Sequence, residues 1–153
     1  MYSLKKFPYI LLFFVMLFTY TNNLSAQCNS FAKKKCLPSL SPYTHNGQLN
    51  STQLGAGETA ELAMTFYSGQ NYRLKVCHDP SIEGVYFKLK DSDHKELYNS
   101  HDKDSQHFDF NVKSTQQMFI EVVVPDHKDG EHSKGGHDIT HSGCVSVLVG
   151  FKP

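Results

Sequence analysis

Apolar and polar residues alternate along much of the chain, and this period of two limits the fold more than any other feature of the sequence. The alternating segments are 59–66, 72–77, 85–90, 107–112, 118–124 and 145–151, with a shorter segment at 95–99. Alternation with β-branched and aromatic residues at the apolar positions is typical of strands that bury one face. We find no stretch with a sustained helical stripe of apolar residues.

Turn signals separate these segments about every ten residues, which indicates seven or eight short strands. We therefore predict an all-β fold, an antiparallel two-sheet β-sandwich of jelly-roll-like type, over residues 47–153. Residues 27–46 carry two cysteines, three lysines and two prolines and show no such alternation. We predict that they form an irregular N-terminal arm pinned by its cysteines.

Residues 1–26 have the organisation of a cleavable signal peptide. Lys5 and Lys6 precede an apolar run, and a short polar stretch leads to Ala26, which predicts cleavage after Ala26. The uninterrupted apolar part, 9–18, is shorter than the roughly 20 residues of a membrane-spanning helix. We therefore expect a periplasmic or secreted protein without a membrane span. Alternatively, Cys28 is a lipid-modified first residue, although Gln27 precedes it instead of a small residue.

The charge of the mature chain excludes one class of partner. The whole chain has 15 Lys and Arg against 15 Asp and Glu, and the predicted signal removes two lysines and no acid, which leaves a formal charge of −2. Such a balance does not suggest a nucleic-acid binder, and we expect none. The remaining 127 of the 153 residues are enough for one domain of ordinary size.

Four cysteines remain after the predicted cleavage, namely Cys28, Cys36, Cys77 and Cys144. An even number in an exported domain indicates two disulfides, although four cysteines allow three pairings. The absence of a Cys-x-x-Cys pair argues against a zinc knuckle and a thioredoxin-type redox site.

The direction of the strands favours one of these pairings. Successive strands of a sandwich run to opposite ends, so loops 55–57, 78–82, 101–106 and 125–142 are expected at one end, the loop end. The turns at 68–69, 91–94 and 113–116 then lie at the other end, the turn end. Cys77 and Cys144 both fall at the loop end and point away from the apolar residues of their strands. We therefore predict a Cys77–Cys144 disulfide, which leaves Cys28–Cys36.

The segment 126–141 is rich in histidines and acids. Imidazole and carboxylate groups are the usual ligands of zinc, copper and nickel, so the segment is a candidate site for a divalent metal. The candidate ligands are His127, His132, His137, His141 and Asp138. The alternative is a solvated hairpin loop, because the spacing of these residues fixes no metal geometry.

Catalytic motifs give no support for an enzyme. The sequence lacks a His-Glu-x-x-His zinc motif, a Gly-x-Ser-x-Gly elbow and a phosphate-binding glycine loop. We therefore predict a non-catalytic exported module that binds another protein or an envelope component through its sheet edges or its loop end. Two alternatives remain, a metal-binding periplasmic protein that uses loop 126–141 and an uncharacterised hydrolase.

Two resemblances agree with this expectation. Segments 55–60, 67–77 and 85–91 resemble bacterial pre-peptidase C-terminal domains, which implies a non-catalytic β-sandwich of the kind attached to secreted enzymes. Segments 28–34, 45–51 and 143–151 are similar to a family of small exported proteins of Gram-negative bacteria. That second resemblance implies the compartment and a one-domain architecture, and no particular activity.

Overall fold

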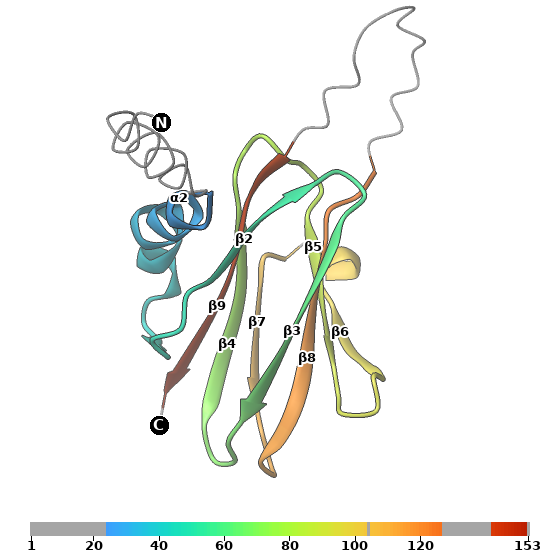
Figure 1. Cartoon of the computed structure of the whole chain (residues 1–153). Coiled ribbons are helices and arrows are strands. Elements are labelled where there is room, and N and C mark those ends of the chain that lie inside the picture. The colour runs from blue at the N-terminus through green and yellow to red at the C-terminus, as the bar shows by residue number, and fades with distance from the viewer. Residues whose placement is uncertain (1–23, 104, 127–141, 153) are drawn as a thin grey trace, which may run out of the picture.

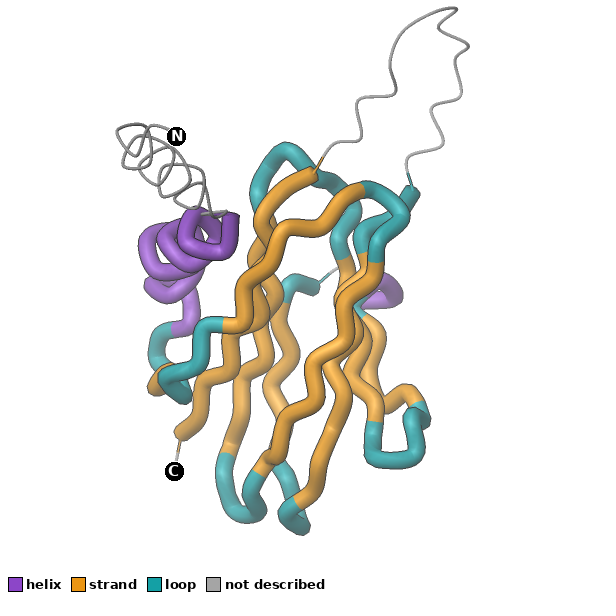
Figure 2. The backbone as a smooth tube through the Cα atoms, in the orientation of Figure 1, coloured by secondary structure: helices purple, strands orange, loops and turns teal. Residues whose placement is uncertain are grey.

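Two antiparallel sheets pack face to face in the computed structural model, which describes residues 24–103, 105–126 and 142–152 (Figures 1 and 2). The predicted two-sheet β-sandwich is confirmed. The strands are β1 Thr44–His45, β2 Asn50–Gly55, β3 Thr59–Phe66, β4 Asn71–His78, β5 Tyr86–Lys90, β6 Glu96–Asn99, β7 His107–Asn111, β8 Gln116–Val123 and β9 Ser142–Lys152. The sequence pattern indicated all of them except β1 and β2.

The strand order places the chain's longest strand near the middle of the larger sheet. One sheet has the order β1-β9-β4-β7, with β2 also paired to β9, and the other has the order β3-β8-β5-β6. All the pairings are antiparallel.

The inward positions of the alternating segments form one core, in which Phe66, Phe87, Leu74, Ile120 and Val149 are almost completely buried. Burial of such side chains is the main stabilising contribution to the fold.

The N-terminal arm is helical, so the prediction of an irregular arm is wrong. Helix α2 spans Leu24–Phe31, a π-helical turn η2 spans Ala32–Cys36, and a 3₁₀ turn η3 spans Leu37–Leu40. These turns cover the outer face of the larger sheet beside β9 and β2 (Figure 1). The buried residues of the arm, Cys28, Ala32, Cys36 and Leu40, recur every fourth residue, which is the spacing of one helix face. No helix in the described part of the chain is long and apolar enough to span a bilayer.

The disulfides join the arm to the sheet, and the predicted pairing is therefore wrong. Cys28 is bonded to Cys144 and Cys36 to Cys77, with Cα–Cα distances of 5.2 and 5.9 Å. Eight residues of helix separate Cys28 from Cys36 by about 12 Å at 1.5 Å per residue, more than a disulfide can span. Cys77 and Cys144 do lie near each other on the outer face, since Asp79 N donates to Cys144 O, but each faces an arm cysteine.

Three of the four connections that strand direction predicts at the loop end meet there, as far as the described residues extend. A Cβ on Gly57 would contact Asp126, and a Cβ on Gly84 would contact Pro125. Gly143, in β9, lies against Asp79, Ser81 and Ile82 of the β4–β5 loop. The loops near 55–58, 79–85 and 124–126 are therefore neighbours at one end of the sandwich.

Gly150 is the point of closest approach between the arm and β9. A Cβ at this position would lie 2.7 Å from Tyr43 Cβ and 3.0 Å from two atoms of Leu40. We expect Gly150→Ala to lower the free energy of unfolding by about 1 to 3 kcal/mol, because the arm must shift to admit one methyl group. Urea unfolding followed by circular dichroism measures the change. An unchanged midpoint would show that the arm does not pack on β9 this closely.

Candidate functional site: the cleft between β2 and β3

The two sides of the sandwich, where the edges of the two sheets face each other, differ in structure. On one side the edge strands β6 and β7 meet, and the rings of Tyr98 and Phe108 stack there with their centroids 3.9 Å apart. On the other side β2 and β3 diverge from the turn that connects them (Figure 2). This side holds a cleft of about 230 Å³ that reaches the core, which we call the β2–β3 cleft.

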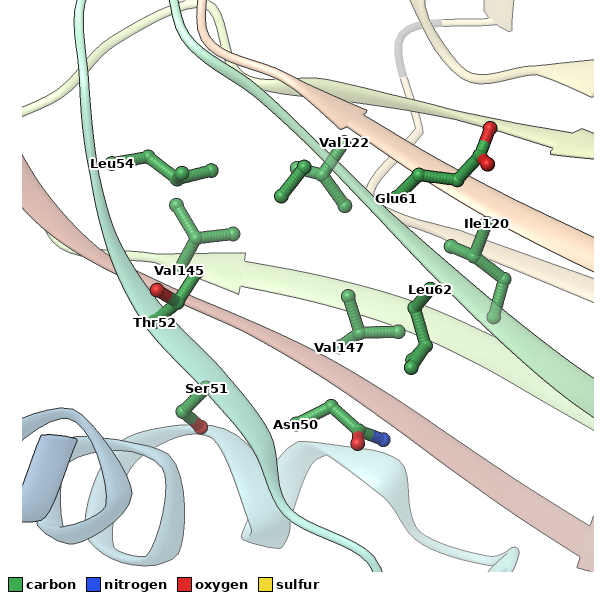
Figure 3. A pocket seen from close by; sticks show the side chains of 11 residues that line it. Asn50, Ser51, Thr52, Leu54, Glu61, Leu62, Ile120, Val122, Val145 and Val147 are labelled. Atoms are coloured by element: carbon green, nitrogen blue, oxygen red, sulfur yellow. The ribbon is translucent and has the colours of Figure 1, made fainter.

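Apolar side chains from four strands line the β2–β3 cleft. They are Leu54, Leu62, Ile120, Val122, Val145 and Val147. Figure 3 shows these side chains converging on the space between β2 and β3, whereas the carboxylate of Glu61 points away from it. An apolar concave surface with a few polar groups is typical of a binding site.

Strand β2 supplies the polar groups of the cleft. Its inward positions are Asn50, Thr52 and Leu54, and only Leu54 is buried. Its outward residue Ser51 is hydrogen-bonded to Ser146 Oγ at 2.9 Å. Asn50 Nδ2 is buried and has no hydrogen-bond partner. A buried donor without an acceptor is costly, so this amide lowers the stability of the fold.

Replacing this amide tests that cost. We expect Asn50→Leu to raise the free energy of unfolding by about 1 kcal/mol, because a side chain of similar shape removes the unsatisfied donor. Chemical denaturation of the two proteins measures the difference. A loss of more than about 1 kcal/mol would mean that the amide does satisfy its hydrogen bonds in the free protein.

A second cavity continues along β3 toward the turn end, and we call it the turn-end cavity. Its volume is about 490 Å³. It borders residues 63–66 of β3 and residue 67 in the turn that follows, whereas the β2–β3 cleft borders residues 60–62 of β3. Met64, Phe66, Val149 and Phe151 are among its lining residues. Asn46 Nδ2 approaches Met64 Sδ at 3.7 Å across it. The two cavities together follow the whole free edge of β3.

The titratable groups in the two cavities do not form a catalytic pair. Among the described lining residues, Glu61 is the only carboxylate, and Tyr67 and Tyr72 are the only other ionisable side chains. The Tyr72 hydroxyl accepts a hydrogen bond from Tyr67 N at 2.9 Å and so has a structural role. General acid–base or nucleophilic catalysis needs a nucleophile or acid with a partner in reach. The described lining of the two cavities offers no such pair.

A bidentate ionic contact lies outside these cavities, on the outer face of the larger sheet. Arg73 Nε and Nη2 each donate to a carboxylate oxygen of Asp109 at 2.7 Å, and Tyr43 Oη donates to the same carboxylate at 3.1 Å. The hydrogen bonds from Arg73 hold the pKa of Asp109 below its ordinary value. The guanidinium also lies 4.5 Å from the centroid of the Tyr43 ring. This network ties β4 and β7 to the end of the N-terminal arm.

The lowered pKa of Asp109 makes part of the stability depend on pH. A carboxyl whose folded pKa lies below its unfolded value stabilises the protein above the unfolded pKa and loses this effect as the pH falls through the folded pKa. We expect Asp109→Asn to cost about 0.5 to 1 kcal/mol at pH 7, after allowance for solvent screening of the partly exposed pair. The difference from the unmodified protein should shrink below about pH 4. Chemical denaturation of both proteins from pH 7 to pH 2.5 measures the difference in the free energy of unfolding. A difference that stays constant over this range would contradict a lowered pKa of Asp109.

The metal site predicted from the sequence lies outside the described residues, because His127, His132, His137, Asp138 and His141 all fall within 127–141. Among the residues with described positions, no three His, Cys, Asp or Glu side chains gather closely enough to hold a metal. The four cysteines predicted in disulfides are all bonded, in the pairing given above. Sequence reasoning missed the β2–β3 cleft, because β2 is too polar to show the alternation of a strand.

Comparisons with known proteins give a likeness in fold only. No protein-family model matches the chain, and no curated protein matches it in sequence. The fold is similar to that of PliG. The crystal structure of Aeromonas hydrophila PliG, a periplasmic lysozyme inhibitor of g-type lysozyme, matches with a TM-score of 0.50 and 8% identity over 72% of this chain and 89% of that one. Salmonella Typhimurium PliG, another inhibitor of g-type lysozyme, gives a TM-score of 0.42 and 13% identity over 69% and 86%.

Proposed function

We propose that this chain is an exported, non-catalytic domain that binds a protein partner at the β2–β3 cleft. The observation that carries the proposal is an apolar cleft that stays open on one side of the sandwich, while the Tyr98–Phe108 stack closes the opposite side. Exposed apolar surface of this kind mainly marks interaction sites in soluble proteins.

Export is part of the proposal. The signal-like residues 1–26 and two disulfides that staple the arm to the sheet both favour an oxidising compartment. N-terminal sequencing and the intact mass of the protein recovered from a periplasmic or culture fraction test this part. Cleavage after Ala26, with Gln27 as the first residue, is the expected result. A full-length chain retained in the cytoplasm would exclude it.

Two tryptophan variants of β2 test whether the cleft is the binding surface. Thr52 is exposed and faces into the cleft, whereas its neighbour Gln53 is equally exposed and faces outward, where Nε2 bonds Ser142 Oγ. We expect a tagged chain with Thr52→Trp to lose the proteins that co-purify with it from the native envelope. The Gln53→Trp chain should retain them as the unmodified chain does. Equal recovery with both variants would place binding elsewhere.

A narrower candidate is inhibition of a g-type lysozyme. The fold likeness to PliG, whose structure is that of a periplasmic inhibitor of this enzyme, favours it over other partners. The purified mature chain, added in increasing amounts to g-type lysozyme, should slow the clearing of a bacterial cell-wall suspension, with c-type lysozyme as the control enzyme. Undiminished clearing by the g-type enzyme at a large excess of the chain would exclude inhibition of this lysozyme. The broader proposal, that a protein partner binds at the β2–β3 cleft, would then rest on the Thr52→Trp test.

A further inference from the structure

We propose that the free edge of β3 receives an extended, basic peptide segment of the protein partner, which adds a fifth strand to the four-stranded sheet. The inference rests on the proposed function and names how the partner is held. Strand addition of this kind combines main-chain hydrogen bonds along an exposed edge with pockets for alternate side chains. Both features are present along β3.

Strand β3 is the least protected edge in the described part of the sandwich. It has eight residues in unbroken register with β8, from Thr59 opposite Val123 to Phe66 opposite Gln116. The edge strands β2, β6 and β7 have six, four and five residues. Helix α2 packs beside β2, and the pairing of β6 contains a bulge. Natural edges are normally blocked by lysine, proline, bulges or short length. The sequence of β3, TAELAMTF, has none of these features.

The register shows which peptide groups of β3 are free. Residues that lie opposite each other in an antiparallel pair alternate between hydrogen-bonded and non-bonded positions. Val124 N donates to Glu58 O at 2.9 Å, so the even-numbered residues of β3 are those bonded to β8. The N–H and C=O groups that point to the open edge belong to the odd-numbered residues, Thr59, Glu61, Ala63 and Thr65. This row of donors and acceptors is what an added strand requires.

The cavities lie where the side chains of such a strand would point. An added strand would run about 4.8 Å from β3, with alternate side chains on the inner face of the sheet. On that face the β2–β3 cleft borders residues 60–62 and the turn-end cavity borders residues 63–67. Apolar side chains of the segment would fill the two cavities.

The charges beside β3 select a basic segment. Glu58 and Glu61 are both exposed next to the edge, and the described lining of the two cavities contains no lysine, arginine or histidine. Lys90 Nζ and His94 Nδ1 each lie 4.0 Å from Glu61, but the Lys90 ammonium is hydrogen-bonded to Glu121 and the His94 side chain is exposed. A segment with Lys or Arg at its outward positions would therefore gain ionic contacts with Glu58 and Glu61, whereas an acidic segment would be repelled.

A proline pair tests the role of the edge. Ala63→Pro removes a free-edge N–H without removing a hydrogen bond to β8, a position at which edge strands tolerate proline. His107→Pro is the control on the opposite edge strand, because Val76 N donates to Gln106 O and the His107 N–H therefore points away from β4, where it donates only to Ser105 Oγ at 3.3 Å. The first probe is a ten-residue peptide in which valine alternates with lysine or threonine. The second is the same peptide with glutamate in place of each lysine, and the third is g-type lysozyme.

The expected result is binding of the lysine peptide to the oxidised full chain, at least tenfold weakened by Ala63→Pro and unchanged by His107→Pro. Glu61→Gln should weaken it several-fold, and the glutamate peptide should not bind. Hydrogen exchange on the unmodified chain gives a readout that needs no variant, because the amides of residues 61, 63 and 65 should become protected when the peptide binds. Protection confined to other residues, or equal binding by both proline variants, would overturn the strand-addition inference.

The outcomes separate this inference from the proposed function. If g-type lysozyme or an envelope protein binds the chain and Ala63→Pro binds it equally well, the chain is a protein-binding module but β3 is not its docking edge. If Thr52→Trp leaves partner binding intact as well, the proposed use of the cleft also fails. Peptide binding that depends on Ala63 and Glu61 supports both.

Discussion

Removal of the Cys28–Cys144 disulfide, with both cysteines replaced by alanine, should lower the free energy of unfolding by about 4 to 5 kcal/mol. The two residues are 116 positions apart, so the bond closes almost the entire mature chain into one loop and greatly restricts the unfolded state. It also holds α2 on the outer face of β9. Urea unfolding of the oxidised unmodified protein and of the double variant measures the difference.

The second disulfide provides the control for this prediction. Cys36 and Cys77 are 41 positions apart, and their double alanine variant should lose about 4 kcal/mol, slightly less than the first. The smaller loop is nested in the larger one, so the two losses should not add when all four cysteines are replaced. A Cys28–Cys144 variant as stable as the unmodified protein would mean that the arm is not a stabilising part of the fold.

Truncation of Phe66 to alanine should cost about 3 to 5 kcal/mol. The ring is completely buried and packs edge-on against Tyr72 and Phe110, with centroid distances of 5.0 and 5.3 Å. Its removal leaves a cavity in the aromatic cluster that joins the ends of β3, β4 and β7. Thermal and chemical denaturation would both register the loss.

The adjacent residue makes a matched control, because side chains alternate between the two faces of a strand. Tyr67 is 61% exposed, and Tyr67→Ala should change the free energy of unfolding by less than about 0.5 kcal/mol. Equal losses at both positions would contradict the assignment of Phe66 to the core face. A change in partner binding by Tyr67→Ala, at unchanged stability, would extend the binding surface along the turn-end cavity.

The sandwich could be predicted from the sequence because its core strands bury one face in contact with the opposite sheet. Leu74 and Val76 in β4 and Ile120 and Val122 in β8 alternate with polar neighbours, and all four are buried. Strand direction also placed Cys77 and Cys144 at the same end and on the same face. These features follow from the period of two and from loop lengths, which are local properties of the chain.

The disulfide pairing could not be deduced in the same way, because it depends on where the arm lies. An irregular arm allows its two cysteines to meet, whereas a helix holds Cys28 and Cys36 about two turns apart and presents both to the sheet. The signal was present as the four-residue spacing of Cys28, Ala32, Cys36 and Leu40. Three consecutive lysines and a nearby proline made the segment look like an irregular loop instead of a helix.

The cleft was not predictable because one of its walls does not have the pattern of a core strand. Asn50 and Thr52 occupy inward positions of β2, where apolar residues would complete the alternation with Leu54. Sequence patterns indicate strands that bury apolar residues, and they miss a strand whose inner face remains partly open. The polar residues on the inner face of β2 explain why the sequence did not indicate this strand, and the same residues line the candidate site.

Site-specific photocrosslinking in the native envelope tests the central claim most directly. A photoreactive amino acid would replace Ala63, at the edge of the cavities, or His107, on the opposite edge of the sandwich. If the β2–β3 side is the binding surface, irradiation should link the chain to a protein from position 63 and not from position 107. Adducts of equal yield from both positions, or an adduct from position 107 alone, would contradict the account.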